Sequence, residues 1–442
     1  MSKVEWRPAI LLSVFSLAGF LINASTFSSL GVVLPGMVAE EHWTWLEAGF
    51  GFTLLGACCG FSSFIPALLI RRFGVRTTLI VGSAVMVGGF ACLAQTQGIG
   101  LYFLGAGLCG VGYQMMALIP ATHVLAAVYK HRGRPFGVYF TASALGGVAG
   151  PLLVGVVLHG FSEHWRVFWQ IQMVLSAVLG VITAALCGGT DWLAKVSQKT
   201  DEAVAEEVAT APKGGVYRTP VDWTPRQALR TPHFYILLAA YFGHLLIGVS
   251  VAAMSVEHLT EHKVSVSVAR YMLSLESLVQ IIARAVGGAI IDYVEPRLLL
   301  VLSLAALVLG AAALSVADTY PTMLLYALGS GLGFGLTALA VTVLLLNYFG
   351  RRHNLEIFSL TCLIGGVSAL GPTLGGALRD ATGGFGSTFQ IYAAVIAVVF
   401  VAAVLMRPPR PSRLIGVGVH DEPETRGAAA PATSAALAQD PA

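Results

Sequence analysis

Charged side chains are scarce in this sequence, and that scarcity excludes whole classes of protein. Asp, Glu, Lys and Arg make up 11% of the 442 residues, whereas hydrophobic residues make up 56%. Soluble domains carry about 25% charged residues, and so low a content would leave too much apolar surface in water. The net charge of +3 gives no basic face for nucleic acid. The composition therefore predicts an integral membrane protein that binds no nucleic acid.

Motifs of catalysis and metal binding are missing as well. Neither HExxH nor GxSxG occurs, so we expect no enzyme and no cofactor. The apolar N-terminal stretch is longer than the core of a signal peptide, about 7–15 residues, and predicts a first span instead. The cysteines form no CxxC pair and have no histidine at metal-ligand spacing, so we expect no metal site: Cys58, Cys59, Cys92, Cys109, Cys187 and Cys362.

Long apolar runs are what the sequence has in place of charge. From Pro8 to Val38 no charged residue occurs, and about 20 apolar residues suffice to cross a bilayer. Hydropathy predicts an all-α integral membrane fold with twelve transmembrane helices, at about 9–38, 45–70, 77–96, 99–129, 136–160, 166–188, 232–258, 264–292, 297–317, 320–349, 355–379 and 385–406.

The distribution of Lys and Arg predicts the orientation. If both termini and the even-numbered connections are cytoplasmic, that side holds 21 of the 26 Lys and Arg residues. We expect a multi-pass protein of a bacterial inner (plasma) membrane. Residues 189–231 form a polar cytoplasmic loop between two bundles, and the tail at 407–442 has the composition of a disordered segment.

An internal repeat relates the two halves of the chain. The pattern Leu-Tyr-x-Leu-Gly-x-Gly-Leu at 101–108 recurs at 325–332, and Gly150-Pro151 recurs as Gly371-Pro372. Nearly constant offsets in equivalent spans indicate duplication. The prediction is therefore two pseudo-symmetric six-helix bundles, 1–188 and 232–406, with a solute site between them near the midplane.

With this repeat the chain resembles the major facilitator superfamily, whose signature is a Gly-x-x-x-Asp-Arg-x-Gly-x-Arg turn after the second span. The first copy, 67–76, has Arg71 at the Asp position, and the second copy, 288–297, keeps Gly and Asp. The resemblance implies gating turns in which charge at a helix end holds one conformation, with an altered latch at Arg71. Their residues are Arg72, Gly74, Arg76, Gly288, Asp292 and Arg297.

One predicted span carries charge well away from its ends. Glu276, Gln280 and Arg284 are spaced i, i+4 and i+8, along one stripe of a helix. A charge at mid-bilayer depth costs about 2.5–3.5 kcal/mol or more and usually has a function. Arg284 presents a planar fork suited to a carboxylate. The alternative is that Arg284 pairs with an acid of a neighbouring helix and only holds the bundle together.

This stripe makes the chain similar to the monocarboxylate porters and the oxalate/formate exchangers. Their Asp-x-x-x-Arg pair maps to Gln280 and Arg284, and a lysine late in their first span maps near Ser28 and is absent. The segment 223–232 also opens the second half as in bacterial members. The resemblance implies a bound carboxylate at Arg284, but the missing Asp and Lys argue against simple lactate/proton symport.

Further residues are candidates for the solute and proton sites. A carboxyl in an apolar helix favours its protonated form, so Glu276 is the first candidate for proton coupling, followed by His244 and His123. A lone histidine in a span is also commonly a packing group. The uncharged groups expected to bind solute, each of which could instead hold helices together, are Asn23, Tyr113, Gln114, Tyr139 and Tyr392.

These features together predict a secondary active transporter that works by alternating access. Its expected partners are membrane lipids and a small organic solute, most simply a carboxylate, with or without protons, and it would function as a monomer. Two alternatives stay open: uptake of a vitamin-like or larger polar compound, and proton-coupled efflux of toxic compounds. The motif Gly-x-x-x-Gly-Pro at 146–151, typical of drug/proton antiporters, supports efflux, although the duplication also explains it.

Overall fold

The computed structural model describes residues 6–43, 45–131, 133–160, 164–187, 193–200, 202, 216–219 and 221–409. In this part of the chain all regular secondary structure is helical. Residues 189–192, 201, 203–215 and 220 of the predicted loop at 189–231, and all but the first residues of the predicted tail at 407–442, lie outside the described residues.

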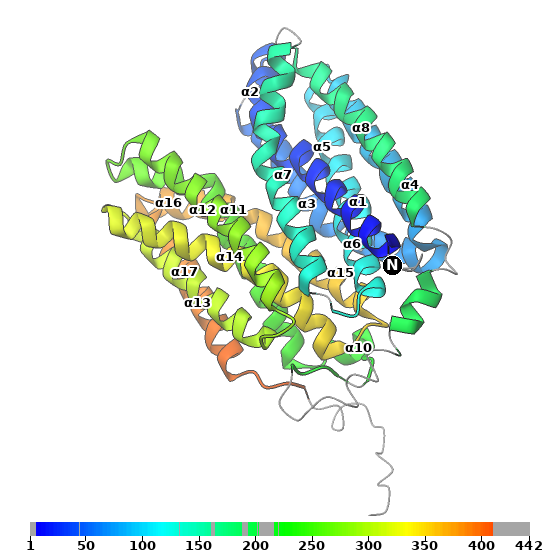
Figure 1. Cartoon of the computed structure of the whole chain (residues 1–442). Helices are drawn as coiled ribbons and strands as arrows, with labels where there is room; N and C mark the ends of the chain where they lie inside the picture. Colours follow the sequence, from blue (N-terminus) through cyan, green and yellow to red (C-terminus); the bar gives the residue numbers. More distant parts are fainter. Residues whose placement is uncertain are drawn as a thin grey trace, which may run out of the picture. The chain divides into compact units, whose positions relative to one another are not determined.

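The first half contains six spans, several of which are broken into shorter helices (Figure 1). In chain order its elements are α1 (Trp6–Asn23), η1 (Ala24–Ser28), α2 (Ser29–Glu41), α3 (Trp45–Phe61), α4 (Phe64–Ala94), α5 (Ile99–Tyr113), η2 (Gln114–Leu118), α6 (Ile119–Val128), α7 (Gly133–Gly160) and α8 (Trp165–Leu186).

The second half also contains six spans, which follow a short helix, α10 (Pro225–Ala228). Its elements are α11 (Pro232–Glu261), α12 (Val266–Ile290), α13 (Pro296–Ser315), α14 (Tyr320–Phe349), α15 (Asn354–Gly365), η3 (Gly366–Leu370), α16 (Gly371–Thr382) and α17 (Gly386–Leu405).

The helices confirm the predicted architecture of two six-helix bundles. Ten helices in the described part of the chain are long and apolar enough to cross a membrane, and a shorter apolar helix at Glu47–Phe61 belongs to the second span. The fifth span corresponds to α7, of 28 residues. The boundaries differ from the predicted ones mainly where spans are broken or kinked.

The second and third spans meet in a way that hydropathy does not show. The second span turns at Ser62 and Ser63 and continues in the first part of α4, since adjacent small polar residues allow a helix to bend. Its true end is the kink at Gly74, whose φ of 82° lies in a region that L side chains rarely adopt. Only glycine therefore fits this turn without strain.

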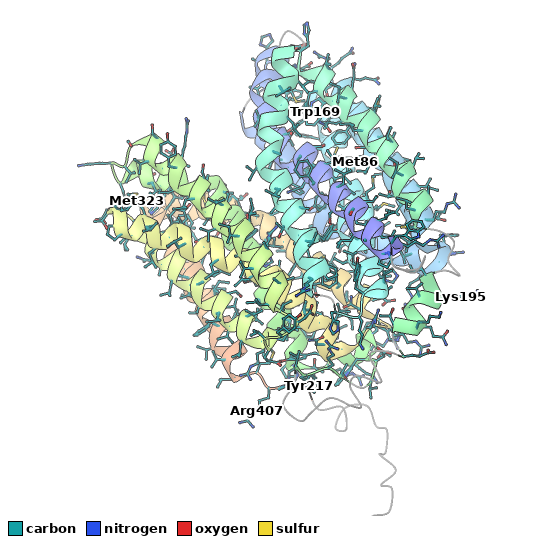
Figure 2. All side chains as sticks on the ribbon, viewed as in Figure 1. Met86, Trp169, Lys195, Tyr217, Met323 and Arg407 are labelled. Carbon is teal, nitrogen blue, oxygen red and sulfur yellow. The ribbon has the colours of Figure 1, made fainter. Side chains whose placement is uncertain are left out.

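Three other spans are broken near their middle. The first and fourth contain π-helical turns at Ala24–Ser28 and Gln114–Leu118, and the eleventh contains a 3-10 turn at Gly366–Leu370. Such interruptions often occur at functional sites, because they change the direction of side chains and free backbone groups. The core of the first half is regular by comparison, with Phe90 stacked on Trp169 at 5.8 Å, near Met86 (Figure 2).

The two halves meet through paired glycines, from the middle of the spans to one end of the bundle. A Cβ atom on Gly60 of α3 would lie 2.1 Å from Cα of Gly366, and one on Gly288 of α12 would lie 2.3 Å from Cα of Gly137 in α7. Backbones can approach this closely only where no side chain intervenes. We call this end, which carries the Gly74 kink and the turns after α6, α12 and α14, the closed end.

The opposite end, which we call the open end, is held within each half. Arg166 of α8 forms ion pairs with Glu40 and Glu41 of α2, the second at 2.8 Å. In the other half, Arg379 of α16 pairs with Glu261 of α11 at 2.6 Å. Each of these ion pairs joins two helices of the same half, so none of them connects the two halves.

Candidate functional site

The site is built on α12, which is positioned by its neighbour α14. Glycines of α14 let its backbone approach the α12 backbone: a Cβ on Gly331 would lie 2.5 Å from the Glu276 carbonyl oxygen, and one on Gly335 2.6 Å from that of Gln280. A serine cap starts α12, since the Ser265 hydroxyl accepts a hydrogen bond from the Val268 amide. The stripe from Glu276 to Arg284 is therefore held in a fixed register.

Arg284 lies where the two halves touch. Its Nη1 donates to the carbonyl oxygen of Phe140 in α7, at 3.3 Å, and the guanidinium lies 5.5 Å from the ring centroid of Phe334 in α14. Its Nε is buried and has no hydrogen-bonding partner among the described residues. A cation with an unused donor at this depth is suited to receive an anion.

Aromatic side chains of the second half surround this guanidinium. His244 of α11 lies 4.9 Å from Tyr241 and 5.2 Å from Phe334, between ring centroids. Gly248 leaves the space for Phe334, since a Cβ there would lie 2.0 Å from that ring. His244 and Arg284 are close enough to interact electrostatically. The surroundings combine one cation with flat, mostly apolar faces.

The first half contributes residues of the π-helical turn in the fourth span. Tyr113 lies within electrostatic range of Arg284 and packs edge-on against Phe27 at 5.3 Å. The Gln114 side chain is 3% exposed, and its Oε1 has no hydrogen-bonding partner in the described part of the chain. The structure thus brings His244 and Arg284 of the predicted set together at the Phe334 ring.

Other predicted solute contacts lie inside one half. The Asn23 amide donates to the Ser143 carbonyl at 2.6 Å, and the Tyr392 hydroxyl donates to the Gly371 carbonyl at 2.7 Å. Tyr139 is buried against Gly19. All three make the helix-to-helix contacts that the sequence left open as their alternative role.

The predicted proton carriers are separated along the bundle. Glu276 is 7% exposed and has one weak hydrogen bond, from the Ser277 hydroxyl at 3.4 Å. His244 lies beside Arg284, whereas His123 of α6 lies near Arg351, toward the closed end. Glu276 and His244 are therefore the two candidates that share the region of Arg284.

The two predicted gating turns contact the opposite half at the closed end, one through hydrogen bonds to a helix start and the other through an ion pair. The Asp292 carboxylate accepts hydrogen bonds from the Gly133 amide at 3.0 and 3.1 Å, at the start of α7, where a helix favours negative charge. In the other copy Arg71 forms an ion pair with Glu356 in the first turn of α15, at 2.6 Å. At this turn a positive side chain, Arg71, therefore stands where the motif has a negative one, and it binds a carboxylate of the other half.

The remaining residues of the predicted gating turns are placed around these latches. Arg297 donates to carbonyl oxygens of Ala403 and Val404 in the last turn of α17, so it caps a helix within its own half. Arg72 lies over the ring of Phe73 and is exposed, as is Arg76. Gly74 and Gly288 supply the kink and the close contact described above.

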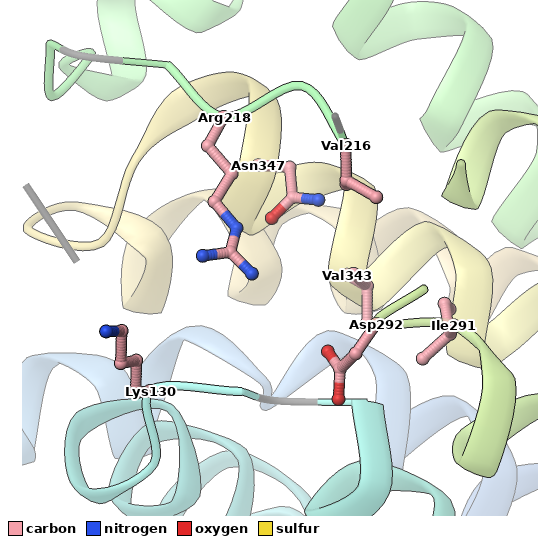
Figure 3. Close-up of a pocket in the computed structure, with 7 residues that line it drawn as sticks. All are labelled: Lys130, Val216, Arg218, Ile291, Asp292, Val343 and Asn347. Carbon is pink, nitrogen blue, oxygen red and sulfur yellow. The ribbon is translucent and has the colours of Figure 1, made fainter. Parts of the chain in front are cut away.

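A small pocket at the closed end lies between the inter-bundle loop and the turn at Asp292. Figure 3 shows Lys130 and Arg218 directed toward it, with Asp292 turned toward the start of α7. The loop is anchored beside it, since the Thr219 amide donates to the Asn347 carbonyl at 2.8 Å. The part of the loop around Thr219 is therefore attached to the end of α14.

Two carboxyls outside the spans have shifted pKa values. Burial raises the pKa of Glu295, which precedes α13 and accepts a hydrogen bond from the Tyr217 amide. At the open end the hydrogen bond from Arg166 lowers the pKa of Glu40. Burial therefore favours the neutral form of Glu295, whereas the contact with Arg166 favours the charged form of Glu40.

Several residues of the site have no signal in the sequence alone. Phe140 reaches Arg284 through its backbone carbonyl and Phe334 through its ring, and both contacts depend on how α7 and α14 pack against α12. The one available hint is that Phe334 stands between Gly333 and Gly335, a pattern that favours close helix packing.

Comparison with known proteins gives a consistent result. Residues 16–258 and 237–432 match the family model of the Major Facilitator Superfamily. Human monocarboxylate transporter 2 is 22% identical over 406 residues, which are 86% of this chain and 83% of that protein. The aspyridones efflux protein apdF of Emericella nidulans is 24% identical over 369 residues, 80% of this chain and 66% of that protein.

Solved structures share the fold. A proton:xylose symporter, XylE, superimposes with a TM-score of 0.68 at 12% identity, covering 89% of this chain and 94% of that one. The human organic anion transporter MFSD10 gives a TM-score of 0.65 at 15% identity, covering 91% of this chain and 100% of that one. At these identities the similarity concerns the fold and not the solute.

Proposed function

The chain belongs to the major facilitator superfamily, and on that premise we propose that it carries a small organic carboxylate across the membrane by alternating access, with Arg284 as the anion-binding group. The family consists of transporters, so the expectation of a transporter and not an enzyme is confirmed. The substrate, the coupling and the direction are parts of the proposal.

The observation that carries the proposal is the state of Arg284. It is a cation within a span, its Nη1 reaches a backbone carbonyl of the opposite half, and its Nε has no partner among the described residues. A structural arginine would have its donors used by an acid of a neighbouring helix. Here the donors remain for a planar anion, which a guanidinium binds through paired hydrogen bonds.

The relatives support an anionic solute. One is a monocarboxylate transporter and one solved neighbour is an organic anion transporter. The aromatic surroundings of Arg284, formed by Tyr113, Tyr241, His244 and Phe334, suit a carboxylate with an apolar body. This arrangement favours a monocarboxylate over a solute that carries many hydroxyl groups.

Arg284 also offers a way to link binding to alternating access. Its hydrogen bond to Phe140 joins α12 to α7, which pack against each other, and in our proposal these two helices separate when the closed end opens. A carboxylate that competes for the guanidinium weakens this bridge, so bound solute shifts the balance between the two states. With the predicted orientation, the state described here faces outward, because its closed end carries the cytoplasmic connections.

Proton coupling is the second part of the proposal. Glu276 lies two turns from Arg284 on the same helix, buried and weakly hydrogen-bonded. A carboxyl in such surroundings binds and releases a proton as solvent access changes. The structural neighbours XylE and a fucose:proton symporter, FucP, are proton symporters, which supports symport as the mode.

The placement in the cell follows the Lys and Arg distribution. We propose a monomeric, multi-pass protein of an inner (plasma) membrane, with both termini in the cytoplasm. Accessibility of single cysteines introduced after α2 and after α14, to a reagent that does not cross membranes, tests this orientation. Labelling from outside at the first position and not at the second agrees with it, and the reverse contradicts it.

The test of the anion site is uptake by the purified protein in liposomes. Radiolabelled lactate, pyruvate, oxalate and benzoate are offered to wild type, Arg284→Ala and Arg284→Lys, with Arg270→Ala as control, since Arg270 is exposed on the same helix. Loss of a buried charged partner costs about 2–5 kcal/mol, so Arg284→Ala should lower uptake by about 30-fold or more. Normal anion uptake by Arg284→Ala disproves the site.

Efflux is the second candidate, favoured by the similarity to the efflux protein apdF. It predicts that cells lacking the protein accumulate a toxic anion, whereas uptake predicts that they fail to grow on a carboxylate. Growth of a deletion strain on single carboxylates and in the presence of toxic acids separates the two directions.

A further inference from the structure

A surface groove lies at the closed end of the first half, between α1 and the start of α7. Its volume is about 410 Å³. Its walls are formed by Leu12 of α1, by residues 129–131 of the turn after α6, and by Arg134, Pro135 and Val138 of α7. None of these described lining residues is acidic, and none belongs to the surroundings of Arg284. The groove is therefore a feature separate from the proposed anion site.

The groove is basic at one end and apolar at the other. Lys130 and Arg134 supply positive charge at its outer end. Val138 lies one turn further along α7, about 6 Å deeper in the span, and half of its side chain is exposed. Leu12 lies about 9 Å beyond Trp6, the exposed first residue of α1. A phospholipid has the same order, with a charged headgroup at the membrane surface and acyl chains toward the midplane.

Exposed aromatic side chains indicate the depth of the basic end. Trp6 at the start of α1 and Tyr293 after α12 are 51% and 72% exposed. Trp and Tyr are enriched where spans meet the lipid headgroups, so Lys130 and Arg134 lie at headgroup level. With the predicted orientation this is the cytoplasmic leaflet, whose anionic lipids attract basic side chains.

An apolar face of α7 continues the groove toward the midplane. Val138 and Leu145 are exposed and lie on the face of the helix that carries Arg134. Other faces of α7 contact helices, since a Cβ atom on Gly137 would clash with the α12 backbone and one on Gly146 with the α1 backbone. From Arg134 to Leu145 the helix rises by about 16 Å, which is about the hydrocarbon depth of one leaflet.

Arg134 is held at the edge of the groove by the second half. Its Nη2 donates to the Tyr293 hydroxyl at 3.2 Å, and the guanidinium lies 5.8 Å from the centroid of that ring. A guanidinium has five N–H donors, so a phosphate can be bound through the planar fork while this contact persists. The Asp292 carboxylate is engaged by backbone amides at the start of α7.

We propose that this groove binds an anionic phospholipid of the cytoplasmic leaflet. Lys130 and Arg134 bind its phosphodiester, and the α7 face at Val138 and Leu145 takes up an acyl chain. A lipid of the ordinary surrounding layer needs only the apolar face, whereas two cations at one end of the groove select negative charge. The site does not involve the solute, so it stands whether or not a carboxylate is carried.

Native mass spectrometry of the full-length protein tests the site. Protein in detergent is mixed with equal amounts of phosphatidylglycerol and phosphatidylcholine that have the same acyl chains, and the bound lipids are compared. Wild type should retain phosphatidylglycerol preferentially. Lys130→Gln combined with Arg134→Gln should lower the bound ratio of phosphatidylglycerol to phosphatidylcholine about tenfold or more. Arg226→Gln combined with Arg230→Gln is the matched control, because it removes two exposed charges at and just after α10.

Equal binding of the two lipids by wild type overturns the proposal, and so does an equal fall of the ratio in the control variant. The single variants Lys130→Gln and Arg134→Gln keep the test decisive if the double variant does not fold, since each should lower the ratio about fivefold. A second measurement separates the lipid from its headgroup. An excess of glycerol 3-phosphate should leave phosphatidylglycerol bound, whereas displacement by this soluble anion contradicts the acyl-chain contact.

Discussion

The glycine pair at Gly60 and Gly366 makes a quantitative prediction about the contact that joins the two halves between mid-span and the closed end. A methyl group at residue 60 would lie 2.1 Å from Cα of Gly366 and 2.8 Å from its nitrogen. Carbon atoms pack at about 3.5–4.0 Å, so α3 and η3 must separate by about 1.5 Å. Both partners of this clash are backbone, which cannot move aside as a side chain can.

The expected cost follows from this overlap. Overpacking a tight contact costs about 1–3 kcal/mol, and a state in which the two halves separate at this end avoids the cost. Gly60→Ala should therefore shift the equilibrium away from the closed-end state by about 5–150-fold. Gly366→Ala, whose Cβ would lie 2.6 Å from Cα of Gly60, should act in the same direction.

A native cysteine reports on this shift. Cys362 of α15 is 3% exposed and lies between Tyr241 of α11 and Cys59 of α3, so it is shielded while the halves meet. Labelling by N-ethylmaleimide, followed peptide by peptide with mass spectrometry, should accelerate at Cys362 in Gly60→Ala. Cys109 is buried inside the first half and should stay unlabelled if that bundle remains folded.

Gly56→Ala is the matched control, on the same helix one turn earlier. Its Cβ would lie 3.5 Å from that of Ala369, an ordinary contact, so Cys362 labelling should not change. Unchanged labelling in Gly60→Ala would refute the reasoning. A parallel rise at Cys109 would also refute it, because the bundle would then have loosened as a whole.

The remaining predictions concern charge at the same end. Arg71→Glu should weaken the closed-end state by about 1 kcal/mol, since Arg71 and Glu356 form a partly exposed pair, and Arg71→Glu combined with Glu356→Arg should restore it. Failure of the double variant to recover the Cys362 labelling rate contradicts this role of the ion pair. Glu295→Gln should be more stable than wild type, and increasingly so as pH rises. The pKa of Glu295 is raised in the folded protein, so ionisation of this carboxyl lowers the stability of wild type once the pH exceeds the unfolded-state value of 4.5. Thermal unfolding in detergent at pH 5 and pH 8 should show a stability gap between Glu295→Gln and wild type that widens at pH 8, and a constant gap speaks against this origin.

The sequence predicted those features that depend on local composition. Apolar runs predicted the spans, and Glu276, Gln280 and Arg284 were identified because charge in an apolar helix is conspicuous without any knowledge of its neighbours. The turn at Asp292 was also recognisable, because its motif is contiguous in the chain.

Other features depend on contacts between distant segments and could not be predicted. Nothing near Arg71 reveals that Glu356 faces it, and a tyrosine such as Tyr392 looks like a solute contact until its hydroxyl is seen to donate to a backbone carbonyl. The helix breaks at Ser62 and Ser63 without a break in the apolar run, so hydropathy does not reveal this turn.

The interrupted spans have a consequence for how such a protein diversifies. A π-helical turn holds one more residue than an α-helical turn, so one residue gained or lost at Ala24–Ser28 or Gln114–Leu118 can be taken up in the turn while the helix on both sides keeps its register. These places can absorb a change of length without disturbing the ion pairs and glycine contacts at either end. The residues of these two turns can therefore change during evolution while the ion pairs and glycine contacts of the bundles are kept.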